Sequence, residues 1–174
     1  MTKKTIDNIT DYTTLIFLTI YVFAEIFTWD SSRLTAQSYH YWIISILGFM
    51  HLMGNSQKMV NKNQFTPYYF FALICIALGL LKKYISGDNF PDVILTSSPL
   101  AYMLLLHISL KLLFPLYPNM KRRFVIISFS KYGATWDGKN SGYQPDKKES
   151  LLSAISFFGT IIYFAILIIF FVCK

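Results

Sequence analysis

Long apolar runs separated by short polar connections dominate the sequence. A helix that crosses the hydrocarbon layer of a bilayer needs about 20 mostly apolar residues, and five stretches approach that length. Aromatic residues gather at several of their ends, as is typical of segments that meet a membrane interface. The pattern predicts an all-α integral membrane protein, a polytopic helical bundle of about five transmembrane helices. The predicted spans are residues 12–29, 39–54, 67–84, 92–117 and 151–172.

The second stretch is the weakest of the five, because about 16 residues are short for a full crossing. It begins with an aromatic group that includes Trp42, and it reaches Gly54 and Asn55, a pair that commonly ends a helix. We therefore predict that this helix stops at Gly54. An alternative with four spans, in which this stretch is re-entrant or interfacial, stays open.

The basic residues predict the orientation, since lysine and arginine near the ends of spans collect on the cytoplasmic side. With the N-terminus in the cytoplasm, most of them fall on that side, and seven lie in the predicted cytoplasmic loop 118–150. The doublet Lys82-Lys83 and Lys174 then lie outside. We predict a single transmembrane domain over residues 1–174, with its N-terminus in the cytoplasm and its C-terminus outside.

Composition agrees with a membrane protein. Hydrophobic residues make up 54% of the chain and charged residues only 14%, where soluble domains have about 25%. This excludes a soluble single-core enzyme, and the two cysteines, both in apolar runs, exclude a disulfide scaffold. The net charge of +7 follows from the orientation and predicts no nucleic-acid partner. Richness in isoleucine, lysine, asparagine, phenylalanine and tyrosine is typical of a bacterial inner membrane protein.

Apart from positions within two residues of a span end, four Asp, Glu, His, Lys or Arg side chains fall inside the predicted spans. Each costs about 2.5 to 3.5 kcal/mol near the bilayer centre, so each is a candidate for function. His107 and Lys111 are four residues apart and share one helix face, which makes them candidates for lining a pore. In the alternative interpretation, Lys111 extends to the lipid head groups and His107 bonds to a neighbouring helix. The pore or polar intramembrane candidates are Glu25, His51, His107 and Lys111.

Two further groups of residues predict contacts with other helices and with lipid. In the fifth span, small and hydroxyl residues recur at helical spacing, which is typical of helix packing; these are Ser153, Ser156, Gly159 and Thr160. In the loop, a basic cluster precedes an apolar stretch too short to span and predicts contact with anionic lipid head groups. Its candidates are Lys121, Arg122, Arg123 and Lys131, although these charges could also serve orientation alone.

Known catalytic motifs are absent from the sequence. There is no HExxH, GxSxG or CxxC, and the GxxxxGK spacing at Gly133 to Lys139 lacks the Ser or Thr that a phosphate-binding loop requires next. We therefore predict a non-enzymatic protein with no metal and no cofactor. The leading hypothesis is an oligomeric pore or channel-type protein. Alternatives are an anchoring or regulatory subunit of a larger complex with a cytoplasmic recognition loop, and a redox subunit with haem between His51 and His107.

Overall fold

The computed structural model describes residues 16–17, 19–20, 37–86, 93–126 and 146–172. Within this part of the chain the regular structure is entirely helical, which confirms the all-α prediction. The four long helices are α2 (Gln37–Lys62), α3 (Thr66–Ser86), α5 (Ser98–Leu113) and α6 (Lys147–Val172), and the 3-10 helix η2 (Leu95–Ser97) leads into α5.

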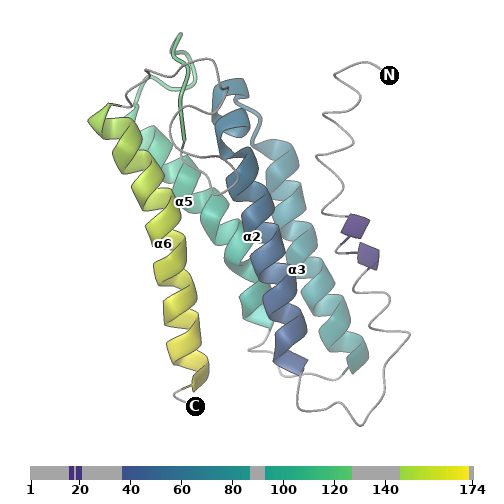
Figure 1. Cartoon of the computed structure of the whole chain (residues 1–174). Helices are drawn as coiled ribbons and strands as arrows, with labels where there is room; N and C mark the ends of the chain where they lie inside the picture. The colour runs from purple at the N-terminus through teal and green to yellow at the C-terminus, as the bar shows by residue number, and fades with distance from the viewer. Residues whose placement is uncertain (1–15, 18, 21–36, 87–92, 127–145, 173–174) are drawn as a thin grey trace.

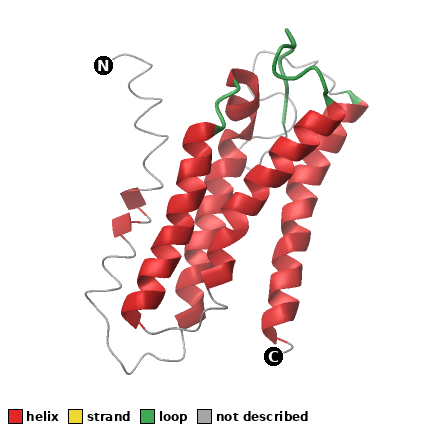
Figure 2. Ribbon diagram, turned by 180° about the vertical axis from the view of Figure 1, so that it is seen from behind, coloured by secondary structure: helices red, strands yellow, loops and turns green. Residues whose placement is uncertain are grey.

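The four helices run side by side, each antiparallel to the one before it in the chain (Figures 1 and 2). α5 crosses between α6 and α2, and α3 lies on the other side of α2. Consequently the end of α2, the start of α3, the end of α5 and the start of α6 all meet at one end of the bundle, here called the basic end. The other end holds the start of α2, the end of α3 and η2.

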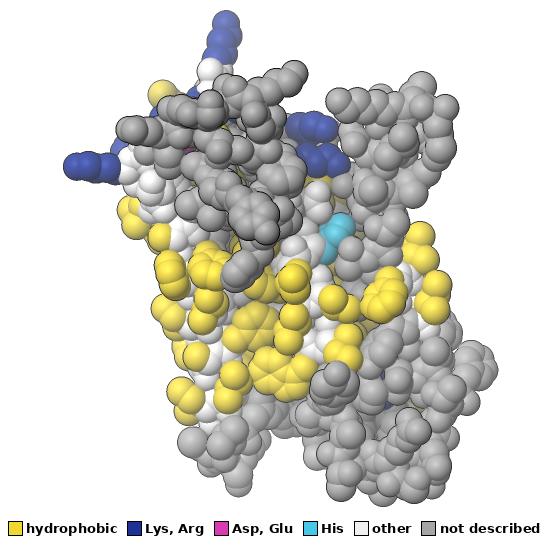
Figure 3. Space-filling model, viewed as in Figure 1, with side chains coloured by type: hydrophobic (Ala, Val, Ile, Leu, Met, Phe, Trp, Pro, Cys, Tyr) yellow, Lys and Arg dark blue, Asp and Glu magenta, His cyan; other side chains and the backbone are white. Residues whose placement is uncertain are grey.

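Among the described residues, three helices are long and apolar enough to cross a membrane: α3 over Thr66–Ile85, η2 and α5 over Leu95–Leu113, and α6 over Lys147–Ile169. Apolar side chains cover much of the face seen in Figure 3, and lysine and arginine lie beyond them at the basic end. Of the first predicted span, 12–29, only residues 16, 17, 19 and 20 lie inside the described part, and they are helical.

The second predicted helix is longer than the sequence indicated, and the predicted stop at Gly54 is wrong. α2 continues for eight residues beyond Gly54, to Lys62. The polar residues that follow Gly54 find partners in their own helix: Asn55 Nδ2 donates to the His51 carbonyl at 2.9 Å, and Ser56 Oγ donates to the Met53 carbonyl at 2.8 Å. Because these groups are satisfied and Met59 is fully buried, the helix has no reason to end there.

The fourth predicted span, 92–117, contains a shorter α-helix than expected. α5 ends at Leu113, and Phe114 adopts φ −129° and ψ 76°, outside the helical region. Pro115 follows, and a residue that precedes proline is disfavoured in the α conformation. The chain beyond Leu113 therefore turns back over the basic end instead of continuing the helix.

The core is apolar and is shared by α2, α3 and α5, with Leu152 of α6 and the segment after α5 completing it. Helices approach closely where glycine faces another element. A Cβ added at Gly79 of α3 would lie 2.7 Å from both Cγ2 and Oγ1 of Thr96, a residue that is fully buried in η2. Thr96 cannot rotate away freely, because its Oγ1 donates to the Val93 carbonyl at 2.7 Å.

We expect Gly79→Ala to lower the free energy of unfolding by about 1 to 3 kcal/mol, since the new methyl group meets a β-branched side chain that is held in place. Gly159→Ala is the matched control: its Cβ would meet only the Leu105 side chain, with Cδ1 at 3.2 Å and Cδ2 at 3.9 Å. This side chain can yield, and alanine gains about 1 kcal/mol of helix propensity over glycine. Thermal unfolding in detergent compares the two, and equal effects would contradict the close contact between α3 and η2.

Candidate functional site

Among the described residues, the most extensive set of long-range polar contacts lies at the basic end. It begins with Asn61 in the last turn of α2. Asn61 Nδ2 donates to the Phe124 carbonyl at 2.9 Å, and the Phe124 N–H donates to Asn61 Oδ1 at 2.6 Å. One side chain thus satisfies both backbone groups of a residue 63 positions away. The segment after α5 is thereby attached to the end of α2.

Aromatic rings fill the space beneath this attachment. Phe124 is 1% exposed and packs edge-on against Phe114, with 4.8 Å between the ring centroids. The Tyr117 hydroxyl lies 3.0 Å from the carbonyl oxygen of Val60 and 3.1 Å from Oδ1 of Asn63. Burial raises the pKa of Tyr117 to about 12, so the hydroxyl keeps its proton and remains a hydrogen-bond donor near neutral pH.

Arg122 attaches the same segment to the start of α6. Its Nη2 atom lies 2.7 Å from Asp146 Oδ2 and 3.2 Å from Glu149 Oε2, and Glu149 has a side chain only 1% exposed. The guanidinium carbon also lies 5.4 Å from the centre of the Phe114 ring and 5.9 Å from that of Phe124. Arg122 therefore compensates a buried carboxylate and packs on two aromatic faces.

Asp146 and Glu149 also cap α6. The Glu149 N–H donates to Asp146 Oδ1 at 2.8 Å, and the Asp146 N–H donates to Glu149 Oε2 at 3.2 Å. This reciprocal pair is a capping box, and it satisfies backbone donors that a helix start leaves unpaired. It starts α6 at Lys147. α6 therefore begins four residues before the predicted span at Leu151, inside the predicted loop 118–150.

The described residues at this end are strongly basic. Eight lie in or just beyond the last turns of α2 and α5 or in the first turn of α6: Lys58, Lys62, Lys111, Lys121, Arg122, Arg123, Lys147 and Lys148. The acidic residues described here are Asp146 and Glu149, and Arg122 contacts both. The excess of positive charge therefore comes from side chains other than Arg122.

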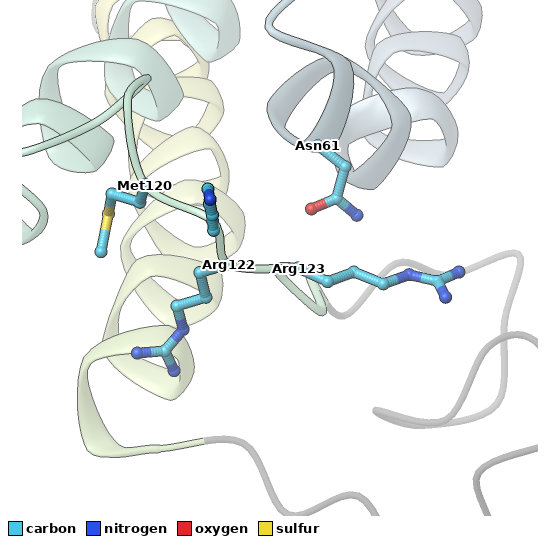
Figure 4. Close-up of a pocket in the computed structure, with 5 residues that line it drawn as sticks. Asn61, Met120, Arg122 and Arg123 are labelled. Atoms are coloured by element: carbon cyan, nitrogen blue, oxygen red, sulfur yellow. The ribbon is translucent and has the colours of Figure 1, made fainter.

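A pocket of about 340 Å³ opens at this end, lined by Asn61, Met120, Lys121, Arg122 and Arg123. Figure 4 shows that Arg122 and Arg123 diverge, with Met120 and Arg122 on one side and Asn61 and Arg123 on the other. Lys121 and Arg123 are exposed, while Arg122 between them is half-buried against α6. The three described basic residues predicted to contact lipid therefore all line the pocket, but one is held against α6 and two are exposed. Lys131 lies outside the described residues.

The candidates inside the spans are not brought together into one site. His107 of α5 faces α3: its Nδ1 atom lies 3.0 Å from the Tyr69 hydroxyl, and its ring stacks on Phe65 with centroids 4.5 Å apart. Lys111, one turn further along α5, is exposed on the outside of the bundle. The two side chains therefore have different surroundings, although they share a helix face. Glu25 lies outside the described residues.

The two histidines contact different faces of the first turns of α3. His51 lies against Phe71, with 4.6 Å between the ring centroids, whereas His107 contacts Phe65 and Tyr69. Since all these partners fall within seven residues, the depths of the two histidines differ by no more than about two helical turns. His51 and His107 therefore pack against different aromatic side chains of this segment.

The small and hydroxyl residues of α6 lie on its inner face. Ser153, Ser156 and Thr160 are buried, and Ser156 and Thr160 donate to carbonyls of Leu152 and Ser156 in their own helix, at 2.8 and 2.9 Å. These hydroxyls are thus satisfied within α6. Gly159 is half-buried beside Leu105 of α5.

Sequence reasoning missed the residues that build the basic end. Asp146 and Glu149 have the spacing of a capping box before an apolar run, so a local signal was present in the sequence. Asn61 carries no such signal, because its partner Phe124 is distant in the chain and the contact involves only backbone atoms of that residue.

We expect the stability of the basic end to fall in acid through Asp146. The Glu149 backbone N–H and the Arg122 guanidinium lower the pKa of this carboxyl. A lowered pKa in the folded state means that the stabilisation is present above the ordinary value of about 3.9 and is lost as pH falls through the lowered value. Between about pH 5 and pH 2.5, the thermal midpoint in detergent should fall more steeply for the wild type than for Asp146→Asn, which keeps the capping oxygen without the charge. Identical profiles would refute this role.

Comparison of the chain with protein families, with curated proteins and with solved structures finds no match. The function proposed below therefore depends on the geometry of the chain's own residues.

Proposed function

We propose that this chain is a non-enzymatic, polytopic membrane protein that serves as an anchoring or regulatory subunit and acts through its basic end. The helices hold that end at the membrane surface, where it meets anionic groups of lipid or of a partner. The observation that carries the proposal is the charge distribution: eight described basic residues gather at one end of the bundle, and the two acidic residues described there are both engaged by Arg122.

The interior of the described bundle supports an anchoring role better than it supports transport through a single copy of the chain. Its core is filled by apolar side chains. Buried hydroxyls bond to one another or to nearby carbonyls, as Ser45 does with Ser98 between α2 and α5 and as Thr160 does within α6. A water-filled path needs a continuous polar lining, and these groups are separate and satisfied.

The proposal includes about five crossings and a cytoplasmic basic end. α2 lies alongside α3 and α5 over much of their length and buries Ile44, Phe49 and Leu52 in the same core, which supports a crossing for α2 as well. Positive charge near the ends of spans favours the cytoplasmic side. The basic end is therefore proposed to face the cytoplasm, in a bacterial inner membrane.

Two single-cysteine variants test this sidedness, in a background where Cys75 and Cys173 are replaced by alanine. Gln64→Cys lies in the exposed turn between α2 and α3 at the basic end, and Tyr84→Cys lies at the other end of α3, where the side chain is 88% exposed. We expect a membrane-impermeant maleimide to label position 84 in intact cells and position 64 only after permeabilisation. The reverse pattern would overturn the proposed orientation and the access of the basic end to cytoplasmic partners.

An oligomeric pore is the second candidate, and the exposure of Lys111 favours it. This lysine lies on the outside of α5 beside the exposed side chains of Ile108 and Leu112. If several copies met along this surface, their lysines would form a ring near the basic end, and such a ring favours anions over cations. Contact of Lys111 with lipid head groups is the competing explanation.

We expect Lys111→Glu to shift the reversal potential toward cations in planar-bilayer recordings of the purified protein, if the pore exists. Lys148→Glu makes the same change of charge on an exposed residue of α6 and should leave selectivity unaltered. A protein that conducts in no lipid tested, or that keeps its selectivity in Lys111→Glu, would eliminate this second candidate and leave the subunit proposal in place.

A further inference from the structure

We infer that the pocket between Asn61, Met120 and Arg123 binds the phosphate of an anionic phospholipid head group. The inference deepens the proposed function and depends on it in one respect, the position of the basic end at the membrane surface. Lys121 and Arg123 are the residues that bind the phosphate, whereas Arg122 holds the wall of the pocket against α6.

The walls of the pocket are held in place before any ligand arrives. Asn61 is fixed by its two hydrogen bonds to the Phe124 backbone, and Arg122 is fixed by Asp146 and Glu149. The chain from Met120 to Phe124 is thereby attached to α2 on one side and to α6 on the other. A site whose backbone is fixed in advance loses less conformational entropy on binding.

Two exposed cations line this fixed frame. Lys121 and Arg123 flank Arg122 in the chain, and both are exposed where Arg122 is half-buried. The Arg123 side chain extends on the side of Asn61 (Figure 4). A guanidinium presents paired donors that match two oxygens of a phosphate, and an ammonium adds a point charge. The pair therefore suits a phosphate in a head group of net negative charge better than one compensated within a zwitterionic head group.

The position of the pocket along the bundle, together with its size, favours a lipid over a free phosphate as the ligand. It is lined by the last turn of α2 and by the residues that follow α5, where the apolar part of the bundle ends. This is the level at which head groups lie when α3, α5 and α6 cross a bilayer. A volume of about 340 Å³ is at the low end for small-molecule sites, enough for a head group while the acyl chains stay in the membrane.

Lipid titration of the full chain in a neutral detergent, read by native mass spectrometry, tests the inference. Phosphatidylglycerol should bind about tenfold more tightly than phosphatidylcholine with the same acyl chains. The double variant Lys121→Gln with Arg123→Gln should lose about tenfold in affinity for phosphatidylglycerol and less for phosphatidylcholine, whose phosphate is already compensated by its own quaternary ammonium. Arg123→Lys, which keeps the charge without the paired donors, should fall between the two and also shows that the segment tolerates substitution.

The matched control is Lys147→Gln with Lys148→Gln, which removes the same two charges from the exposed first turn of α6, outside the pocket. This control variant should lose less than about threefold in affinity for phosphatidylglycerol. Equal losses in both double variants would overturn the pocket and indicate attraction by diffuse charge. Inorganic phosphate that binds as tightly as the lipid, or displaces it, would overturn the lipid as ligand.

Failure of the pocket is distinguishable from failure of the proposed function. Reversed cysteine labelling with intact lipid selectivity would remove the cytoplasmic orientation from the proposed function and leave the head-group site in place, on the outer surface. Correct labelling with no selectivity between the two lipids would remove the pocket and leave the subunit proposal intact.

Discussion

Arg122 is the side chain on which the basic end of the bundle depends. Glu149 is almost completely buried at the start of α6, and a buried carboxylate is tolerated only beside a compensating charge. Arg122 supplies that charge from the segment after α5, and its guanidinium also lies over Phe114 and Phe124. Removing it would strand the carboxylate, a loss of about 3 to 5 kcal/mol for a buried pair. The cap of α6 and the frame of the pocket therefore share one ion pair.

The sequence predicted the apolar helices well, because length and hydrophobicity are local properties. The third predicted span, 67–84, differs from α3 by only one or two residues at each end. Two of the helix boundaries that differ from the prediction depend on hydrogen bonds of polar residues. Asn55 bonds back into its own helix, so α2 does not stop, and Asp146 with Glu149 forms a cap that starts α6 before the apolar run. The spacing of Asp146 and Glu149 predicts the cap of α6, whereas no pattern in the sequence predicts the bond of Asn55.

The candidate site could be predicted only in part. The run Lys121 to Arg123 is visible as a basic cluster, but the sequence treats its three members alike. Their separation into one structural and two exposed side chains depends on Glu149 and on the ring of Phe124, which fix Arg122 against α6. The role of Asn61 could not be predicted either, because its partner is the backbone of a residue 63 positions away. Long-range pairings of this kind have no local signature.

The unbroken length of α2 has a mechanical consequence. Its 26 residues make a rod of about 39 Å, which carries Ser45 near one end of the bundle, His51 against α3 in between, and Asn61 at the wall of the pocket. A helix is stiff along its axis, so a slide of one residue, about 1.5 Å, at the contact between Ser45 and Ser98 displaces Asn61 by the same distance. Asn61 would then draw the Phe124 backbone with it. A displacement at one end of the bundle is thereby transmitted along α2 to the other end, together with the core side chains that α2 carries.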